Sequence, residues 1–145
     1  MSALVVILAA AAVSGAPAVT PVDLIAALFK SEAAELTKHG YVCLQVNGDD
    51  PGEEQLNALS RSNPRVVEGS ACTKVMDTEK GSVHTATGKP AYFFDVHDFV
   101  NDAAETADVK ISIYHHGMWA IFKTLEVRKL DGSWVVLRVK AHSEA

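Results

Sequence analysis

The sequence has 145 residues, of which 13 are basic and 18 acidic, and its formal net charge is −5. The Lys and Arg residues do not cluster, so nucleic acids and anionic membranes, which bind clustered cations, are not expected partners. The length suits one domain that can bury its own core.

The chain begins with an apolar stretch from Ala3 to Val13, followed by the small or helix-breaking residues Ser14, Gly15 and Pro17. This order is typical of a secretory signal peptide, and cleavage after Gly15 or Ala18 satisfies the small-residue rule. The stretch is shorter than the roughly 20 apolar residues that span a membrane. We therefore predict a signal peptide over residues 1–18 and a single α+β domain over 19–145, located in the periplasm or secreted and without membrane attachment after cleavage.

Cys43 and Cys72 are the only thiols in the sequence. In an oxidising compartment two cysteines are expected to pair, so a Cys43–Cys72 disulfide is predicted. The alternative is a catalytic cysteine assisted by a histidine, which requires a free thiol and a neighbour that lowers the pKa of that thiol. No residue near either cysteine indicates such activation.

The first elements of the expected domain are helical and then extended. Apolar residues recur at helical spacing from Pro21 to Lys38 and predict an amphipathic helix that ends before Gly40. A strand is predicted over Tyr41–Val46, and a second short helix from Pro51 through Leu59. Strands are then expected at 72–76, 91–99, 109–114, 118–128 and 133–140.

The last three strands are expected to form an antiparallel meander with turns at His116–Gly117 and Asp131–Gly132, because Asp-Gly is a strong hairpin signal. An apolar sheet face must be buried by another layer. The predicted fold is therefore α+β, with the N-terminal helix packed on a curved, mainly antiparallel sheet that ends in the meander.

Alternation along the strands divides the meander into two faces. The core face is expected to carry Val109, Ile111, Ile113, Trp119, Ile121, Leu125, Val127, Val135, Leu137 and Val139. Apolar residues also fall on the opposite face, where Tyr114, Met118, Phe122, Trp134 and Val136 form a candidate ligand or partner surface. The alternative is that the second helix or the loops cover these residues as more core.

Asp95 and His97 share a strand face by their spacing, and His115 or His116 would approach them if that strand pairs with the meander. A carboxylate and two imidazoles are a weak candidate for an acid/base pair or a metal site. The sequence has no HExxH motif, no Cys/His ligand spacing, no nucleophile elbow and no phosphate-binding loop. We therefore predict no metal and no cofactor.

The segment FKTLEVRKLDGSWVVLRVKAHSEA, from Phe122 onward, resembles the closing hairpin of NTF2-like cone-shaped α+β domains, in which a strand, a DG turn and a Trp-containing strand end the fold. The resemblance implies such a cone as an alternative fold, and it assigns no site residues.

These patterns favour a non-enzymatic exported domain that binds a small apolar molecule or a protein through the second sheet face. One alternative is a small hydrolase- or isomerase-like enzyme that uses Asp95, His97 and His115. Another is an inhibitor or immunity-type protein, which the acidic charge permits. Whether the protein is an enzyme is left open at this stage.

Overall fold

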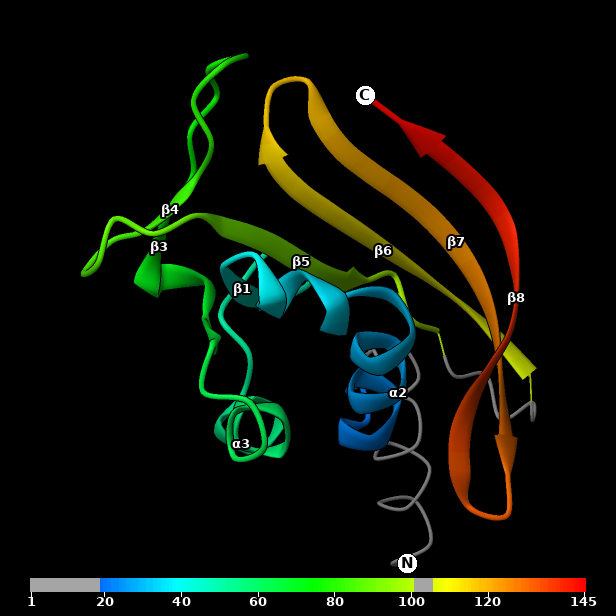
Figure 1. The fold of residues 1–145 in the computed structure, drawn as a ribbon. Coiled ribbons are helices and arrows are strands. Elements are labelled where there is room, and N and C mark those ends of the chain that lie inside the picture. Colours follow the sequence, from blue (N-terminus) through cyan, green and yellow to red (C-terminus); the bar gives the residue numbers. More distant parts are fainter. Residues whose placement is uncertain (1–18, 101–105) are drawn as a thin grey trace, which may run out of the picture.

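The computed structural model describes residues 19–100 and 106–145, and the leader predicted over 1–18 lies outside these ranges. In the described residues the fold is α+β, as predicted: two α-helices and a six-stranded, mostly antiparallel sheet, joined by short 3-10 helices and a small two-stranded sheet (Figure 1). No described helix has the length and apolarity that crossing a membrane requires.

The helix predicted over Pro21–Lys38 is divided into two parts. The α-helix α2 spans Val22–Glu32 and is followed by a 3-10 helix, η1, over Ala34–Lys38. Between them Ala33 has φ −131°, which is not helical. Because Ala, Glu and Leu around this point are good helix formers, local sequence does not account for the break.

The sheet has the strand order β2-β1-β5-β6-β7-β8. Strand β1 (Tyr41–Val46) runs parallel to both β2 (Val66–Glu68) and β5 (Ala91–His97), and helix α3 (Glu53–Ser60) connects β1 to β2. Strands β6 (Thr106–His116), β7 (Trp119–Leu130) and β8 (Ser133–Glu144) follow β5 as an antiparallel meander. Asp131 and Gly132 both have positive φ, which matches the two-residue hairpin predicted there.

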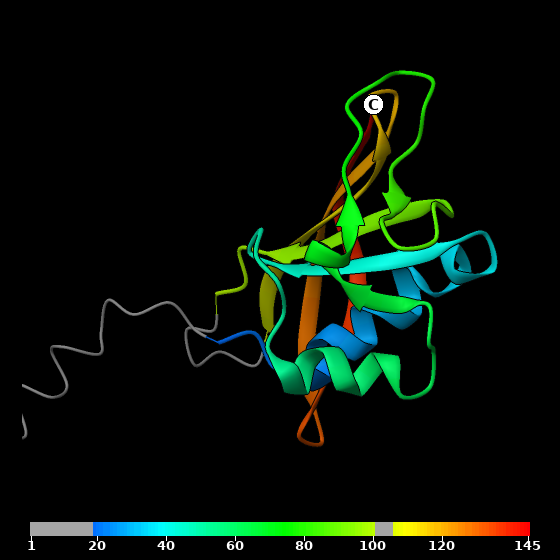
Figure 2. The ribbon, with the colours of Figure 1, turned by 90° about the vertical axis from the view of Figure 1, so that its left-hand side faces the viewer.

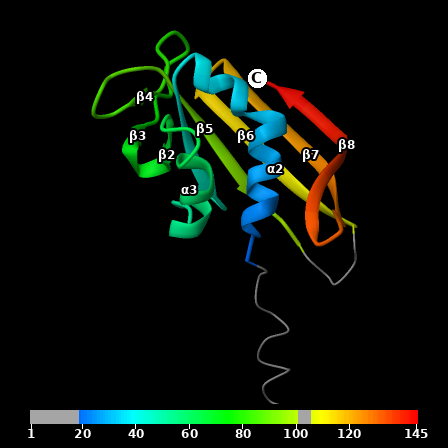
Figure 3. The ribbon, with the colours of Figure 1, turned by 60° about the horizontal axis from the view of Figure 1, so that its bottom comes forward.

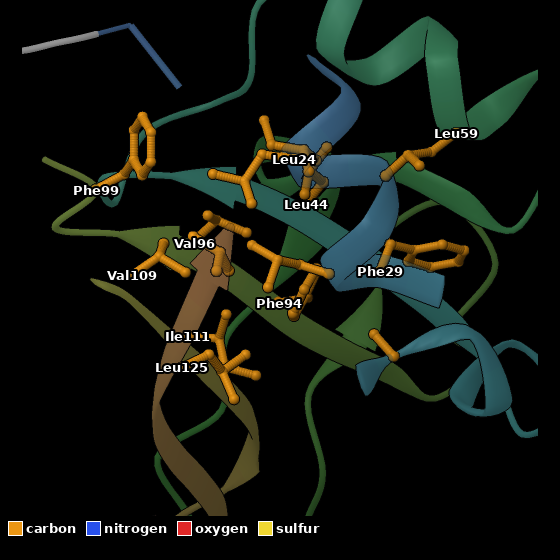
Figure 4. Packing of buried hydrophobic residues seen from close by; sticks show 14 of the residues in the cluster. Leu24, Phe29, Leu44, Leu59, Phe94, Val96, Phe99, Val109, Ile111 and Leu125 are labelled. Atoms are coloured by element: carbon orange, nitrogen blue, oxygen red, sulfur yellow. The ribbon is translucent and has the colours of Figure 1, made fainter. Parts of the chain in front are cut away.

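Helices α2 and α3 lie on the same side of the sheet, called here the helix face (Figures 2 and 3). Leu24 and Leu28 of α2 are fully buried against it, and Leu59 of α3 is in the same core. Figure 4 shows side chains from the central strands meeting these helices. The buried strand residues of this core include Leu44, Phe94, Val96, Val109, Ile111, Leu125 and Val127. The side away from the helices is called the outer face.

The prediction that Val135 and Leu137 of β8 lie in the core is wrong. The two-residue turn pairs Val127 with Val136 and Arg128 with Val135, so Val135 shares the outer face with Arg128. Leu137 is the extra residue of a β-bulge and is exposed. Val139 pairs with Leu125 on the helix face, as predicted, but it is exposed because β8 is the sheet edge.

Residues 72–90 form an arm that crosses the outer face near the β6–β7 turn (Figure 2). The arm contains β3 (Cys72–Thr73) and β4 (Val83–His84), so the strand predicted over 72–76 is only two residues long; the 3-10 helix η2 (Gly69–Ala71) precedes it. The predicted disulfide is confirmed, since Cys43 on β1 is bonded to Cys72. It fastens the base of the arm to β1, next to the edge strand β2.

Candidate binding site on the outer face of the sheet

One end of the outer face is an ordinary solvent-exposed, charged surface. Lys140 Nζ lies 2.9 Å from Asp108 Oδ2, and Arg138 Nε donates a 2.7 Å hydrogen bond to Glu126 Oε1. This hydrogen bond and the charge of Glu126 raise the pKa of the Arg138 guanidinium above its usual value. Paired charges of this kind interact well with water and give no reason to expect a partner here.

The other end of the outer face is apolar. Tyr114 on β6 and Phe122 on β7 are diagonal neighbours on this face, because Tyr114 pairs with Ala120 and Ser112 pairs with Phe122. The Tyr114 hydroxyl lies 3.4 Å from Met76 Sδ of the arm. The arm in turn accepts a hydrogen bond from Gly117 N–H at Asp77 O, 2.9 Å, next to Met118 in the turn. We call Met76, Tyr114, Met118 and Phe122 the outer apolar strip.

Much of this strip is open to solvent. The exposed fractions are 47% for Phe122, 67% for Met118 and 73% for Met76. Methionine is flexible and polarizable, and it is frequent on surfaces that adapt to a bound partner. A group of large apolar side chains exposed side by side on a monomer usually has a function.

The arm holds Tyr114, the partly buried residue of the strip, in place. Lys74 Nζ lies 5.1 Å from the ring centroids of both Phe93 and Tyr114, which is within cation–π distance. The Tyr114 hydroxyl donates a 2.7 Å hydrogen bond to Val75 O. Tyr114 is therefore fixed from two sides, whereas Phe122 is 47% exposed.

A shallow pocket of about 240 Å³ lies beside Phe122. It is formed where β5, β6, β7 and β8 run side by side: His97 pairs with Lys110, Lys110 with Thr124, and Thr124 with Ala141. The lining residues are His97, Lys110, Ile111, Phe122, Lys123, Thr124, Ala141, His142 and Ser143. None of these is acidic, although the whole chain has a net charge of −5.

Acidic residues just outside the pocket interact with its basic groups. Asp98 Oδ2 lies 3.4 Å from His97 Nδ1 and 3.6 Å from Lys110 Nζ, so the His97 and Lys110 side chains share one exposed carboxylate. His142 Nε2 is 3.7 Å from Glu144. Lys123 is different, because its ammonium group makes a 2.7 Å ion pair with Glu32 of α2 on the helix face.

The five residues predicted as a ligand or partner surface do not share one face. Tyr114 and Phe122 lie on the outer face, and Met118 lies in the turn beside it. Trp134, by contrast, is 4% exposed and packs edge-on against the Phe99 ring, with centroids 5.3 Å apart. Val136 packs against the same core. Placing Trp134 and Val136 on the second face is therefore wrong, and the register set by the Asp131–Gly132 turn is the reason.

The structure separates the predicted acid/base residues. Asp95 and His97 share the outer face, but Asp95 pairs with Ser112 and accepts a 3.1 Å hydrogen bond from Gly48 N–H. His115 lies at the bulge between Tyr114 and His116, just beyond the part of β6 that pairs with β5, with its Nδ1 2.8 Å from Ala91 O and its ring stacked on Tyr92. Ala91 and Asp95 are four residues apart on β5, about 13 Å along a strand. The expectation that His115 approaches Asp95 and His97 is wrong.

In residues 19–100 and 106–145 there is no group of three or more His, Cys, Asp or Glu side chains that could hold a metal ion. Two residues of the site, Met76 and Lys110, were not predicted from the sequence. Met76 reaches Tyr114 because the disulfide holds the start of the arm against β1. Lys110 faces the pocket because side chains alternate between the two faces along β6. The alternation was visible in the sequence, whereas the path of the arm was not.

No known protein family, curated protein or solved structure matches this chain. The similarity of the closing hairpin to NTF2-like domains therefore stays a resemblance of one segment.

Proposed function

We propose that this protein is a non-enzymatic binding domain of the periplasm or the extracellular space, which holds the apolar part of a ligand or partner on the outer apolar strip. The observation that carries the proposal is the exposure of Met76, Met118 and Phe122 at one end of a sheet face that the two helices leave open. The helix face contains the larger core, and Tyr114 is the strip residue that packs against the smaller buried cluster of Cys43, Ala91 and Phe93 on the outer face.

Covering the strip would supply useful binding energy. Each of its three exposed large side chains would contribute about 1–2 kcal/mol if a partner removed it from water. Tyr114 is held by Val75 and Lys74, so the surface is ordered before a partner arrives. Pre-ordering reduces the entropy cost of association.

The proposed location rests on two observations. The Cys43–Cys72 disulfide requires an oxidising environment to form and persist. The apolar stretch from Ala3 to Val13, which lies outside the described residues, has the composition of a secretory leader.

Neither rival function gains support. The hydrolase- or isomerase-like alternative required Asp95, His97 and His115 to act together, and β5–β6 pairing places His115 at the other end of β5. Nothing in the described residues favours an inhibitor or immunity-type protein, so that alternative stays a prediction.

The proposal can be tested with a neutral apolar dye, Nile red, whose fluorescence rises on transfer to an apolar surface. Dye affinity would be compared for the wild type, Phe122→Ala and Leu130→Ala. Leu130 is a matched control, because it is on the same strand and its exposed fraction, 43%, is similar to the 47% of Phe122. We expect Phe122→Ala to weaken dye binding about fivefold or more and Leu130→Ala to leave it unchanged.

Native mass spectrometry of the protein recovered from an exporting host provides an independent test. A bound small molecule would appear as extra mass that is lost on denaturation and is absent from Phe122→Ala. A folded Phe122→Ala variant that binds the dye and the co-purifying molecule as well as the wild type would contradict the proposal.

A further inference from the structure

We infer that the pocket beside Phe122 is a binding site for a small amphipathic anion, a carboxylate carried on an aromatic or aliphatic body. The inference deepens the proposed function and rests on it, because the apolar body would lie on Phe122 of the outer apolar strip. It adds a second, polar subsite at the other end of the pocket, formed by Lys110 and His97.

The pocket has the size and walls that such a ligand requires. Its volume of about 240 Å³ accommodates a small molecule and not a folded partner. The half-exposed ring of Phe122 forms the apolar wall, and Thr124 and Ser143 supply hydroxyl groups next to Ala141. His97, Lys110 and Thr124 are directly opposite one another on three adjacent strands, so rigid sheet backbone sets their spacing.

Charge complementarity selects an anion. Every ionisable residue in the lining is Lys or His, and none of the described lining residues is acidic. This local pattern is opposite to the net charge of the chain, −5. A cationic ligand would meet no carboxylate in the lining, whereas an anion could take the place of Asp98 beside Lys110 and His97.

The existing ion pairs leave Lys110 and His97 available. Both approach Asp98 at 3.4–3.6 Å, longer than the 2.7–2.9 Å of a strong charge-assisted hydrogen bond. The Lys110 and Asp98 side chains are 54% and 62% exposed, and ion pairs in water are weak. His142 is similarly loose against Glu144 at 3.7 Å, whereas Lys123 is committed to Glu32 at 2.7 Å and is not part of the anion subsite.

A monovalent carboxylate suits this subsite better than a phosphate. One ammonium and one imidazole can donate to the two oxygens of a carboxylate, and the hydroxyl of Thr124, which is opposite Lys110, is a further donor in the lining. A phosphate has more oxygens and more charge than these groups satisfy. Inorganic phosphate is therefore included in the test as a competing anion.

The test is a set of NMR titrations of the full mature protein, in which backbone amide shifts report both affinity and location. The probes are 3-phenylpropionate, its neutral analogue 3-phenyl-1-propanol, acetate and inorganic phosphate. We expect 3-phenylpropionate to bind about tenfold more tightly than the alcohol, because only the acid makes a charge-assisted hydrogen bond to Lys110. Amides of Lys110, Phe122 and Thr124 should move in both titrations.

Variants separate the two subsites. Lys110→Gln should abolish the preference for the acid and leave alcohol binding unchanged, and Phe122→Ala should weaken both. Lys129→Gln is the matched control, since Lys129 is an exposed lysine on β7 outside the pocket lining. Lys110 is exposed, so its variant should fold normally, and the amide spectrum verifies this.

Four outcomes would overturn the inference. Equal affinity for acid and alcohol, or an unchanged preference in Lys110→Gln, would remove the anion subsite and leave the proposed function standing. Acetate or phosphate binding as tightly as 3-phenylpropionate would remove the apolar component. If neither phenyl compound binds, the Nile red measurement separates the two proposals. Dye binding that depends on Phe122 would mean that only this inference fails. Absence of such dye binding would mean that the proposed function fails too.

Discussion

Phe122 and Trp134 lie on opposite faces of the sheet, although their strands β7 and β8 are paired with each other. Trp134 pairs with Lys129 on the helix face, while Phe122 pairs with Ser143 on the outer face. The Trp134 backbone N–H also donates a 3.2 Å hydrogen bond to Asp23 Oδ2 at the start of α2. Trp134 therefore belongs to the core and Phe122 to the open surface.

The first prediction contrasts these two aromatic residues. We expect Trp134→Ala to lower the free energy of unfolding by about 3–5 kcal/mol, because it removes a buried ring from the core. Phe122→Ala should cost less than about 1 kcal/mol, since half of its ring is already in water. Urea denaturation measures both values. Similar losses for the two variants would contradict the assignment of faces.

The second prediction concerns the disulfide. Cys43 and Cys72 are 29 residues apart, and closing a loop of this length stabilises the folded state by roughly 3 kcal/mol on the chain-entropy model. We expect dithiothreitol to lower the urea midpoint of the wild type by a corresponding amount. The Cys43→Ser/Cys72→Ser double variant should start at that lower midpoint and not respond to the reductant. A double variant as stable as the oxidised wild type would disprove the prediction.

The third prediction concerns the ion pair between Glu32 of α2 and Lys123 of β7. Their side chains are only 10% and 22% exposed, so removing one partner leaves a charge in a largely desolvated place. We expect Lys123→Met to destabilise the protein by about 2 kcal/mol, and the added change Glu32→Gln to restore part of the loss. The control pair, Lys38 and Glu35, is 69% and 84% exposed. Lys38→Met should cost at most about 0.5 kcal/mol, and an equal loss there would refute the argument from burial.

The fourth prediction is a pH dependence at the arm. Asp77 Oδ1 accepts hydrogen bonds from Glu79 N–H at 2.7 Å and Lys80 N–H at 3.2 Å. These bonds favour the charged carboxylate and lower the pKa of Asp77 below its ordinary value of 3.8. Stabilisation by a depressed carboxyl pKa is present above the unfolded value and is lost as the pH falls through the folded value.

We therefore expect the Asp77 carboxyl carbon to titrate below pH 3.8 in an NMR experiment, with the Glu79 and Lys80 amide shifts following the same transition. The Asp77→Asn variant should lose that transition from both amides. A midpoint at or above 3.8 would show that the two hydrogen bonds do not form in solution.

Local chemistry was sufficient to predict much of this protein. Helical spacing indicated α2, the Asp131–Gly132 pair indicated the hairpin, and the alternation in β6 indicated that Val109, Ile111 and Ile113 are buried. These features depend on residues close together in the chain. The number of cysteines likewise left only one disulfide to predict, Cys43–Cys72.

Which face each β8 residue occupies could be predicted in part from the sequence. A two-residue turn requires Val127 to oppose Val136, so the position of Trp134 on the helix face follows from the hairpin once its register is written out. The bulges at Leu137 and Lys140 do not follow, because each depends on how β8 adjusts its twist to β7.

The candidate site was decided by tertiary structure. Met76 meets Tyr114, and His97 lies opposite Lys110, only because the disulfide and the pairing of β5 with β6 bring together segments far apart in the chain. The same pairing sends His115 away from Asp95. Residue types and periodicity determine which elements form, but strand pairing determines which side chains meet, and its register reflects the packing of the whole sheet rather than any single segment.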